Sequence, residues 1–255
     1  MSRDHLRILL PVLSLAILLA AVFYMQPRAM SYFGLNLLFN LAVPVVLATI
    51  AQMMILMVND IDLSIGTFVS FCACITATFV QTDPVVGYAI LFGAILVYAA
   101  MGAIIYARGL PAIVVTLGMS FFWSGMAVLV LPSPGGSAPD WLRALMTAKT
   151  PFLPVAIIAP IVIAAIMHYF VKRSALGVLL RGVGGNEQAI ERSGWSVMGL
   201  KAFAYGVAAL FCVLSGMALV GLATSADANI ALRYTLLSIA GVILGGGEFT
   251  GGRVS

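Results

Sequence analysis

The residues best placed to do chemistry are two carboxylates, Asp60 and Asp62, in the stretch NDIDLSIG at positions 59–66. They fall between two apolar runs, with no water-soluble loop around them. A charge at membrane depth costs about 2.5–3.5 kcal/mol on insertion scales, so each carboxylate needs a structural or functional reason. Asp62 can cap a helix that begins near Leu63, or both carboxylates can border a polar path, with Ser64, where a helix is broken. We favour the cap for Asp62 and expect Asp60 to be dispensable.

The sequence offers no recognisable catalytic centre. It holds two histidines, His5 in the N-terminal tail and His168 near the end of an apolar run. The motifs GxSxG, HExxH and CxxC do not occur in it. Cys72, Cys74 and Cys212 all lie in apolar runs and are interpreted as small buried hydrophobic residues. We therefore assign no catalytic residue, no metal ligand and no cofactor.

Two glycine-rich stretches, 182–185 and 245–253, do not match a phosphate-binding loop. The first follows no predicted strand, and the second lacks the GK[ST] ending whose lysine and hydroxyl would hold phosphate and magnesium. The chain is therefore not expected to bind ATP by itself. Gly241 and Gly245 have the GxxxG spacing that lets transmembrane helices pack closely.

The composition identifies the elements that must position these residues. Of the 255 residues, 62% are hydrophobic and 9% are charged, and the mean hydropathy is +1.12. Soluble domains carry about 25% charged residues, so a soluble enzyme, a disordered chain and a nucleic-acid-binding protein are excluded. We predict an all-α, polytopic transmembrane helical bundle of about eight apolar segments, the last of them half-length or re-entrant. The segments are 8–24, 35–58, 63–80, 85–107, 111–131, 152–171, 202–223 and 235–247.

The basic residues predict the orientation in the membrane. With the N-terminus in the cytoplasm, eight basic residues fall on the cytoplasmic side and four on the outer side, as the positive-inside rule prefers. A cleavable signal peptide is the alternative for the first segment, but no small-x-small cleavage site follows it.

Two connections are long enough to carry a function. The outer loop 132–150 contains a short amphipathic stretch, 141–146. The cytoplasmic loop 172–201 is predicted to hold a short helix over 187–193, with Asn186 as its N-cap and Gly194 as the stop after it.

Three blocks resemble the ribose/monosaccharide permease family of bacterial ATP-binding-cassette (ABC) importers. NDIDLSIGTFVS is similar to the family's GGIDLSVG segment, and LPAIVVTLGMSFFWSGMAVLV (110–130) to its P-x-x-(I/V)-x-T-L-G block. The third block has two parts: GVGGNEQAIERSGW is similar to the family's GGN-x-x-A-x-x-SGI segment, and IAGVILGGGEFTGGRVS, which follows it, to the AAVVLGG-x-x-x-x-GGRGS segment. Asn59 and Asp60 stand where the family has paired glycines. The resemblance also implies two further apolar segments beyond the block that ends at Ser255.

The resemblance implies one transmembrane permease domain over 1–255, with 172–201 as its cytoplasmic coupling loop. The expected partners are a separate ATPase subunit, an extracytoplasmic sugar-binding protein, a second identical or related permease subunit and membrane lipid. Asp60, Asp62, Ser64 and Thr116 are expected to line the translocation path or the helix break. Ala189 and Ile190 are expected to enter a groove on the ATPase, together with Trp195. The residues assigned to the ATPase-coupling loop are Gly185, Asn186, Glu187, Ala189, Ile190, Ser193 and Gly194.

Other functions are possible on the residues alone. An ion-gradient-driven secondary transporter could use Asp60 and Asp62 as proton or sodium sites. An intramembrane hydrolase or acyltransferase would need a nucleophile and base that the sequence does not offer. The basic loop 172–201 could also be a solvated connection without a partner.

Overall fold

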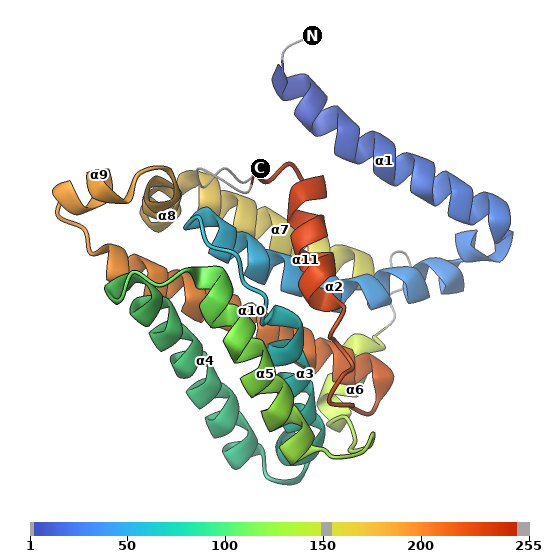
Figure 1. Cartoon of the computed structure of the whole chain (residues 1–255). Helices are drawn as coiled ribbons and strands as arrows, with labels where there is room; N and C mark the ends of the chain where they lie inside the picture. The colour runs from blue at the N-terminus through green and yellow to red at the C-terminus, as the bar shows by residue number, and fades with distance from the viewer. Residues whose placement is uncertain (1–2, 149–154, 249–255) are drawn as a thin grey trace.

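In the computed structural model, all the longer elements are helices (Figure 1). The structure describes residues 3–148 and 155–248, and the side chains of 12–148 and 157–248. Lys149, the start of the predicted segment 152–171 and the last glycines of 245–253 therefore lie outside the described residues. In chain order the elements are α1 (Arg3–Met25), η1 (Pro27–Met30), α2 (Tyr32–Met57), α3 (Ile65–Ile75), η2 (Thr76–Val80), α4 (Pro84–Ala107), α5 (Ala112–Val130), α6 (Asp140–Met146), α7 (Val155–Arg173), α8 (Ala175–Gly185), α9 (Glu187–Arg192), α10 (Val197–Ala223) and α11 (Tyr234–Leu244).

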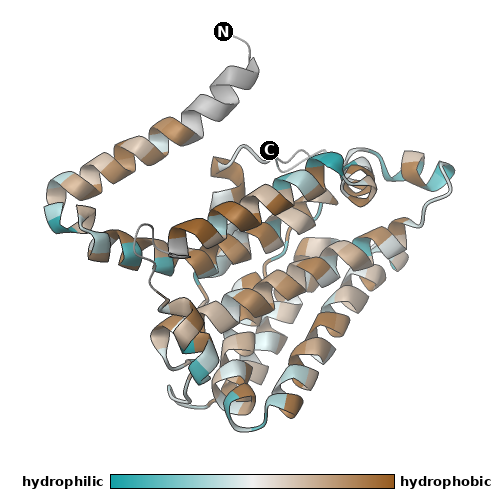
Figure 2. Cartoon of the chain, turned by 180° about the vertical axis from the view of Figure 1, so that it is seen from behind, coloured by the Kyte–Doolittle hydropathy of each residue, from teal (hydrophilic) through white to brown (hydrophobic). Residues whose placement is uncertain are grey.

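The all-α bundle predicted from the sequence is confirmed. Each of the eight apolar segments coincides with a helix, and the single β pairing within 3–148 and 155–248 is an isolated bridge between Gly135 and Ala226. Four of the described helices, α2, α4, α5 and α10, are long and apolar enough to cross a membrane. Figure 2 shows hydrophobic helix bodies, with hydrophilic residues gathered at helix ends and connections. This distribution suits a bundle surrounded by lipid.

Capping side chains explain where several helices begin. Ser31 accepts a hydrogen bond from the Gly34 N–H at the start of α2, and Ser196 accepts one from the Gly199 N–H at the start of α10. At the start of α4, the Asp83 carboxylate accepts from a backbone N–H and is followed by a proline at the first helical position. These are the side chains that satisfy the free N–H groups of a first helical turn.

Helix α10 lies at the centre of the bundle and packs against α2, α3 and α4. Glycines make the close approaches possible. A Cβ atom on Gly216 of α10 would lie 2.8 Å from the Val69 carbonyl oxygen of α3, and one on Gly102 of α4 would lie 2.6 Å from the Tyr205 ring. On the other side, Gly241 of α11 packs directly on Thr49 of α2. The second glycine of the GxxxG pair, Gly245, is the C-cap of α11, and a Cβ on it would meet only carbonyl oxygens of α11 itself.

Two of the apolar helices begin inside the bundle, each after a non-helical segment. Helix α3 begins only at Ile65, after the non-helical segment 58–64, and α11 begins at Tyr234 after a turn-rich connection. The predicted half-length last segment is thus an 11-residue helix. The first turn of α3 lies against the turn that precedes α11, because a Cβ on Gly66 would be 2.6 Å from the Ala231 carbonyl oxygen. Backbone that leaves the helix inside the bundle is therefore covered by protein, as a bilayer requires.

The connection after α7 contains a helix that the sequence analysis did not predict. The chain bends by 69° between α7 and α8, and Ser174 caps α8 by accepting from the Gly177 N–H. Helix α9 follows α8 directly. Helices α8 and α9 lie at one end of α10, whereas α6 packs at the other end, beside Gly221 (Figure 1). A 27-residue helix separates the two ends by about 40 Å.

Candidate functional site

Asp62 does not cap α3, and the interpretation of it as an N-cap is wrong. Its Oδ1 accepts hydrogen bonds from the Ser64 N–H at 2.6 Å and from the Ser64 hydroxyl at 2.7 Å, and its Oδ2 accepts from the Tyr98 hydroxyl. Helix α3 begins only at Ile65, so the Ser64 N–H precedes the helix, whereas an N-cap accepts from the N–H of the second or third helical residue. The N-cap residue of α3 is Ser64, whose side chain makes no capping bond. Asp62 is fully buried and joins the interrupted segment to the middle of α4.

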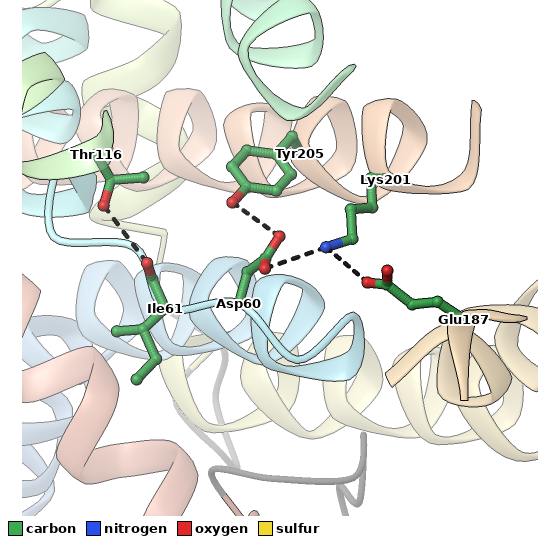
Figure 3. A network of polar contacts seen from close by, with 6 residues as sticks. All are labelled: Asp60, Ile61, Thr116, Glu187, Lys201 and Tyr205. Carbon is green, nitrogen blue, oxygen red and sulfur yellow. Dashed lines mark hydrogen bonds and ion pairs between the residues drawn. The ribbon is translucent and has the colours of Figure 1, made fainter. Parts of the chain in front are cut away.

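Asp60 makes a buried ion pair and a hydrogen bond, which the sequence analysis did not expect of it. It is buried, its Oδ1 lies 3.2 Å from Lys201 Nζ, and its Oδ2 accepts from the Tyr205 hydroxyl at 3.2 Å (Figure 3). Both partners come from the first turns of α10. A buried ion without a partner is strongly unfavourable, so Asp60 and Lys201 depend on each other.

The backbone between the two carboxylates is held by α5. Thr116 is fully buried, its hydroxyl accepts from the Leu63 N–H at 3.1 Å, and it lies 3.4 Å from the Ile61 carbonyl oxygen (Figure 3). On the far side of the break, the Thr235 hydroxyl of α11 accepts from the Gly66 N–H at 2.9 Å. Side-chain hydroxyls thus replace the hydrogen bonds that a continuous helix would have made.

Helix α9 begins and ends as the sequence predicts. The Asn186 side chain accepts from the Ala189 N–H at 3.0 Å, and the helix covers Glu187–Arg192. At its end, the N–H of Trp195 bonds the carbonyl of Ile190, and Gly194 has a φ of 87°. This is a Schellman ending, in which glycine takes the left-handed position.

Two carboxylates tie α9 to the membrane helices. Glu187 Oε1 lies 2.9 Å from Lys201 Nζ of α10, and Glu191 accepts from the Tyr106 hydroxyl in the last turn of α4. Ile190 lies between them and is partly buried, because its side chain packs on Gly182 of α8. The expectation that Ile190 points outward with Ala189 therefore needs revision. Gln188, Ala189 and Trp195 are exposed, and Trp195 is 50% exposed.

The structure brings together the four residues assigned to the helix break, because Asp60, Asp62 and Ser64 share the segment 58–64 and Thr116 bonds its backbone. Sequence analysis missed the partners Lys201, Tyr98 and Tyr205, which lie on helices far along the chain. The one available signal was Lys201 itself, a basic residue beside a long apolar run. No group of three or more His, Cys, Asp or Glu side chains that could hold a metal ion occurs in the part of the chain that the structure describes.

Comparisons with known proteins identify the kind of chain this is. A model of the family described as "Branched-chain amino acid transport system / permease component" matches residues 34–254. The ribose import permease protein RbsC of Haemophilus influenzae is 26% identical over 252 residues, covering 94% of this chain and 77% of its own length. RbsC of Escherichia coli strain K12 is 28% identical, with 95% and 78% covered. The D-allose transport system permease protein AlsC of the same strain is 24% identical, with 82% and 65% covered. No solved structure matches the chain significantly.

The chain therefore belongs to this permease family, and the resemblance predicted from its three sequence blocks is confirmed. It is a multi-pass membrane protein and a permease subunit of the ABC-transporter type. The comparisons give no support to an ion-driven carrier. The carboxylates that such a carrier would use, Asp60 and Asp62, are already engaged by lysine, tyrosine and serine side chains.

Proposed function

We propose that this permease subunit forms part of the translocation path of an importer that carries a monosaccharide of the ribose type across the bacterial inner membrane. The observation that carries the proposal is the match over residues 34–254 together with relatives named for ribose and D-allose. ATP would be hydrolysed on a separate subunit, since no nucleotide-binding motif occurs in the sequence.

The interrupted segment 58–64 is the best candidate for the wall of that path. Non-helical backbone at membrane depth is tolerated where it is buried in protein or lines a cavity. Here it carries Asp60, Asp62 and Ser64, and Thr116 supports it from α5. Broken helices near the midplane are also where many other membrane transporters bind their substrates.

The cytoplasmic helix α9 is the best candidate for the contact with the ATPase subunit. It is a short, capped helix outside the long apolar helices, and an aromatic residue, Trp195, is half exposed beside it. Exposed tryptophans are enriched among residues that dominate binding energy at protein interfaces. This assignment requires the N-terminus and loop 172–201 to be cytoplasmic. The extracytoplasmic sugar-binding protein would then meet the opposite end, near α6, and a second permease subunit would complete the path.

The function is tested by reconstitution. Proteoliposomes that contain this chain, its ATPase subunit and the binding protein should take up radiolabelled ribose when ATP is present and no ion gradient is applied. Uptake that needs a proton or sodium gradient and ignores ATP would contradict the proposal. D-Allose and a branched-chain amino acid, offered in parallel, identify the substrate class.

The docking assignment has a matched pair of variants. Trp195→Ala removes a 50% exposed indole beside α9, and Trp141→Ala removes a 49% exposed indole on α6 at the opposite end. Trp195→Ala should lower the amount of ATPase subunit that co-purifies by at least fivefold, while Trp141→Ala leaves it unchanged. Equal co-purification in both variants would refute docking through α9.

A further inference from the structure

One ammonium group, that of Lys201, joins the cytoplasmic helix to the interrupted segment. Its Nζ lies 2.9 Å from Glu187 Oε1 on α9 and 3.2 Å from Asp60 Oδ1 in segment 58–64 (Figure 3). Segment 58–64 therefore meets α9 and α10, which come much later in the sequence, at one cation. We name Glu187, Lys201 and Asp60 the bridge.

The members of the bridge differ in their access to water. The side chains of Lys201 and Asp60 are 7% and 10% exposed, whereas that of Glu187 is 41% exposed. Leaving the bridge costs a half-exposed carboxylate little, because water can replace its partner. For the two buried ions, separation would leave a desolvated charge without a partner. Glu187 is therefore the member that can be released.

The bridge holds two negative charges and one positive charge, and this imbalance makes it sensitive to the position of Glu187. Two carboxylates share one ammonium, so Glu187 competes with Asp60 for the same cation. When Glu187 leaves, the ammonium belongs to Asp60 alone, and the buried remainder becomes a neutral pair. The repulsion between the Glu187 and Asp60 carboxylates then disappears, so the Asp60–Lys201 pair is more stable and segment 58–64 is held more firmly to α10.

We propose that Lys201 is a positioning residue that converts displacement of α9 into a change in how firmly segment 58–64 is held. This inference rests on the proposed docking of α9 to the ATPase subunit. A partner that pulls α9 outward withdraws Glu187 and tightens the Asp60 contact. A partner that presses α9 inward restores the shared bridge and loosens that contact.

A short series of hydrogen bonds connects Asp60 with the interior of the bundle. Asp62 is two residues further on and accepts hydrogen bonds from Ser64 and from Tyr98 of α4. Thr116 of α5 lies within hydrogen-bonding distance of the backbone on both sides of Asp62. A displacement of Asp60 is therefore passed to side chains on α4 and α5 through consecutive residues of the non-helical segment 58–64.

The experiment compares three variants with the parent in complex with its ATPase subunit. Glu187→Gln imitates a displaced α9 by removing the competing charge. The double variant Asp60→Asn/Lys201→Met removes the buried link without leaving an unpaired buried ion, so it should insert normally where Lys201→Met alone could misfold. Arg28→Met, which changes an exposed arginine of η1 outside loop 172–201, is the control for loss of a cation.

Two quantities are measured in each variant: hydrogen–deuterium exchange of the backbone amides of 58–64, and ribose taken up per ATP hydrolysed. Exchange should slow at least threefold in Glu187→Gln and accelerate at least tenfold in the double variant. Uptake per ATP should fall at least fivefold in both. Arg28→Met should match the parent in every measurement.

The outcomes separate this inference from the proposed function. Unchanged or faster exchange in Glu187→Gln overturns the bridge, whatever the transport result. Parental uptake per ATP in both bridge variants overturns it too. If the parent itself neither retains the ATPase subunit nor transports ribose, the proposed function is wrong, and the exchange measurements still decide whether α9 and segment 58–64 are linked through Lys201.

Discussion

Gly66 and Thr235 are separated by 169 positions in the sequence, yet the Gly66 N–H donates to the Thr235 hydroxyl at 2.9 Å. This contact joins the first turn of α3 to the first turn of α11, the two helices that begin inside the bundle. The Gly66 position is also crowded by backbone, because a Cβ there would lie 2.6 Å from the Ala231 carbonyl oxygen and 2.7 Å from that of Leu232. The meeting of the two breaks therefore requires glycine.

Gly66→Ala should destabilise the protein by about 1–3 kcal/mol, the usual cost of forcing atoms into a packed interior. Gly118→Ala is the matched control, because Gly118 lies in α5 with no atom within 4 Å of its added Cβ. That change should be neutral or stabilising by about 0.5–1 kcal/mol, since alanine favours helix. Thermal unfolding in detergent measures both. A Gly66→Ala protein as stable as Gly118→Ala would contradict the close packing of α3 on α11.

Asp62→Ala should be far more damaging than Asp62→Asn. Alanine leaves the buried Ser64 N–H without its acceptor, and of the Ser64 and Tyr98 hydroxyls, which lie 2.9 Å apart, only one can then donate to the other. Each unsatisfied buried group costs about 1–3 kcal/mol. Asparagine keeps one acceptor oxygen for Ser64 and can donate to the Tyr98 oxygen. The melting temperature of each variant, with Tyr98→Phe as the variant that removes only the phenol, checks this order. If Asp62→Asn has the same low melting temperature as Asp62→Ala, the negative charge is essential to stability and the hydrogen bonds alone do not explain the role of Asp62.

Ile190→Asp should lower the stability of the protein and Ala189→Asp should not, although they place the same charge on adjacent residues. Ile190 packs on Gly182 of α8 and is partly buried, whereas Ala189 is exposed. We expect Ile190→Asp to lower stability by about 1–3 kcal/mol and Ala189→Asp to leave it within about 0.5 kcal/mol of the parent. Chemical denaturation followed by the fluorescence of the tryptophans measures the difference. Equal stability would mean that the outward face of α9 is not the one described.

Single cysteines test the orientation. Ser137 lies before α6 and Gln188 lies on α9, at opposite ends of the bundle. The three native cysteines, all buried, are first replaced. An impermeant thiol reagent added to intact cells should label the cysteine at position 137 and not the one at 188, as the eight-to-four basic asymmetry predicts. The reverse pattern would invert the topology and remove α9 from the cytoplasm.

The sequence by itself determined the class of fold and much of the local structure. Long runs without charge can satisfy their backbone in lipid only as helices, so every predicted apolar segment is a helix. The limits of α9 were also readable, because Asn186 and Gly194 act on backbone groups within a few residues of themselves. Capping interactions of this kind join residues that are close in the sequence, so the sequence alone can reveal them.

The roles of Asp60 and Asp62 were decided only by the tertiary structure. A carboxylate next to a helix start looks like a cap, and nothing nearby in the sequence reveals that Asp62 instead meets Tyr98 or that Asp60 meets Lys201, 141 positions away. Such pairs form because helices packed side by side bring distant residues to the same depth, and the low-polarity interior then forces each buried charge to find a partner. The sequence shows that these charges need partners, but only the packing of α4 and α10 around segment 58–64 determines which ones they have.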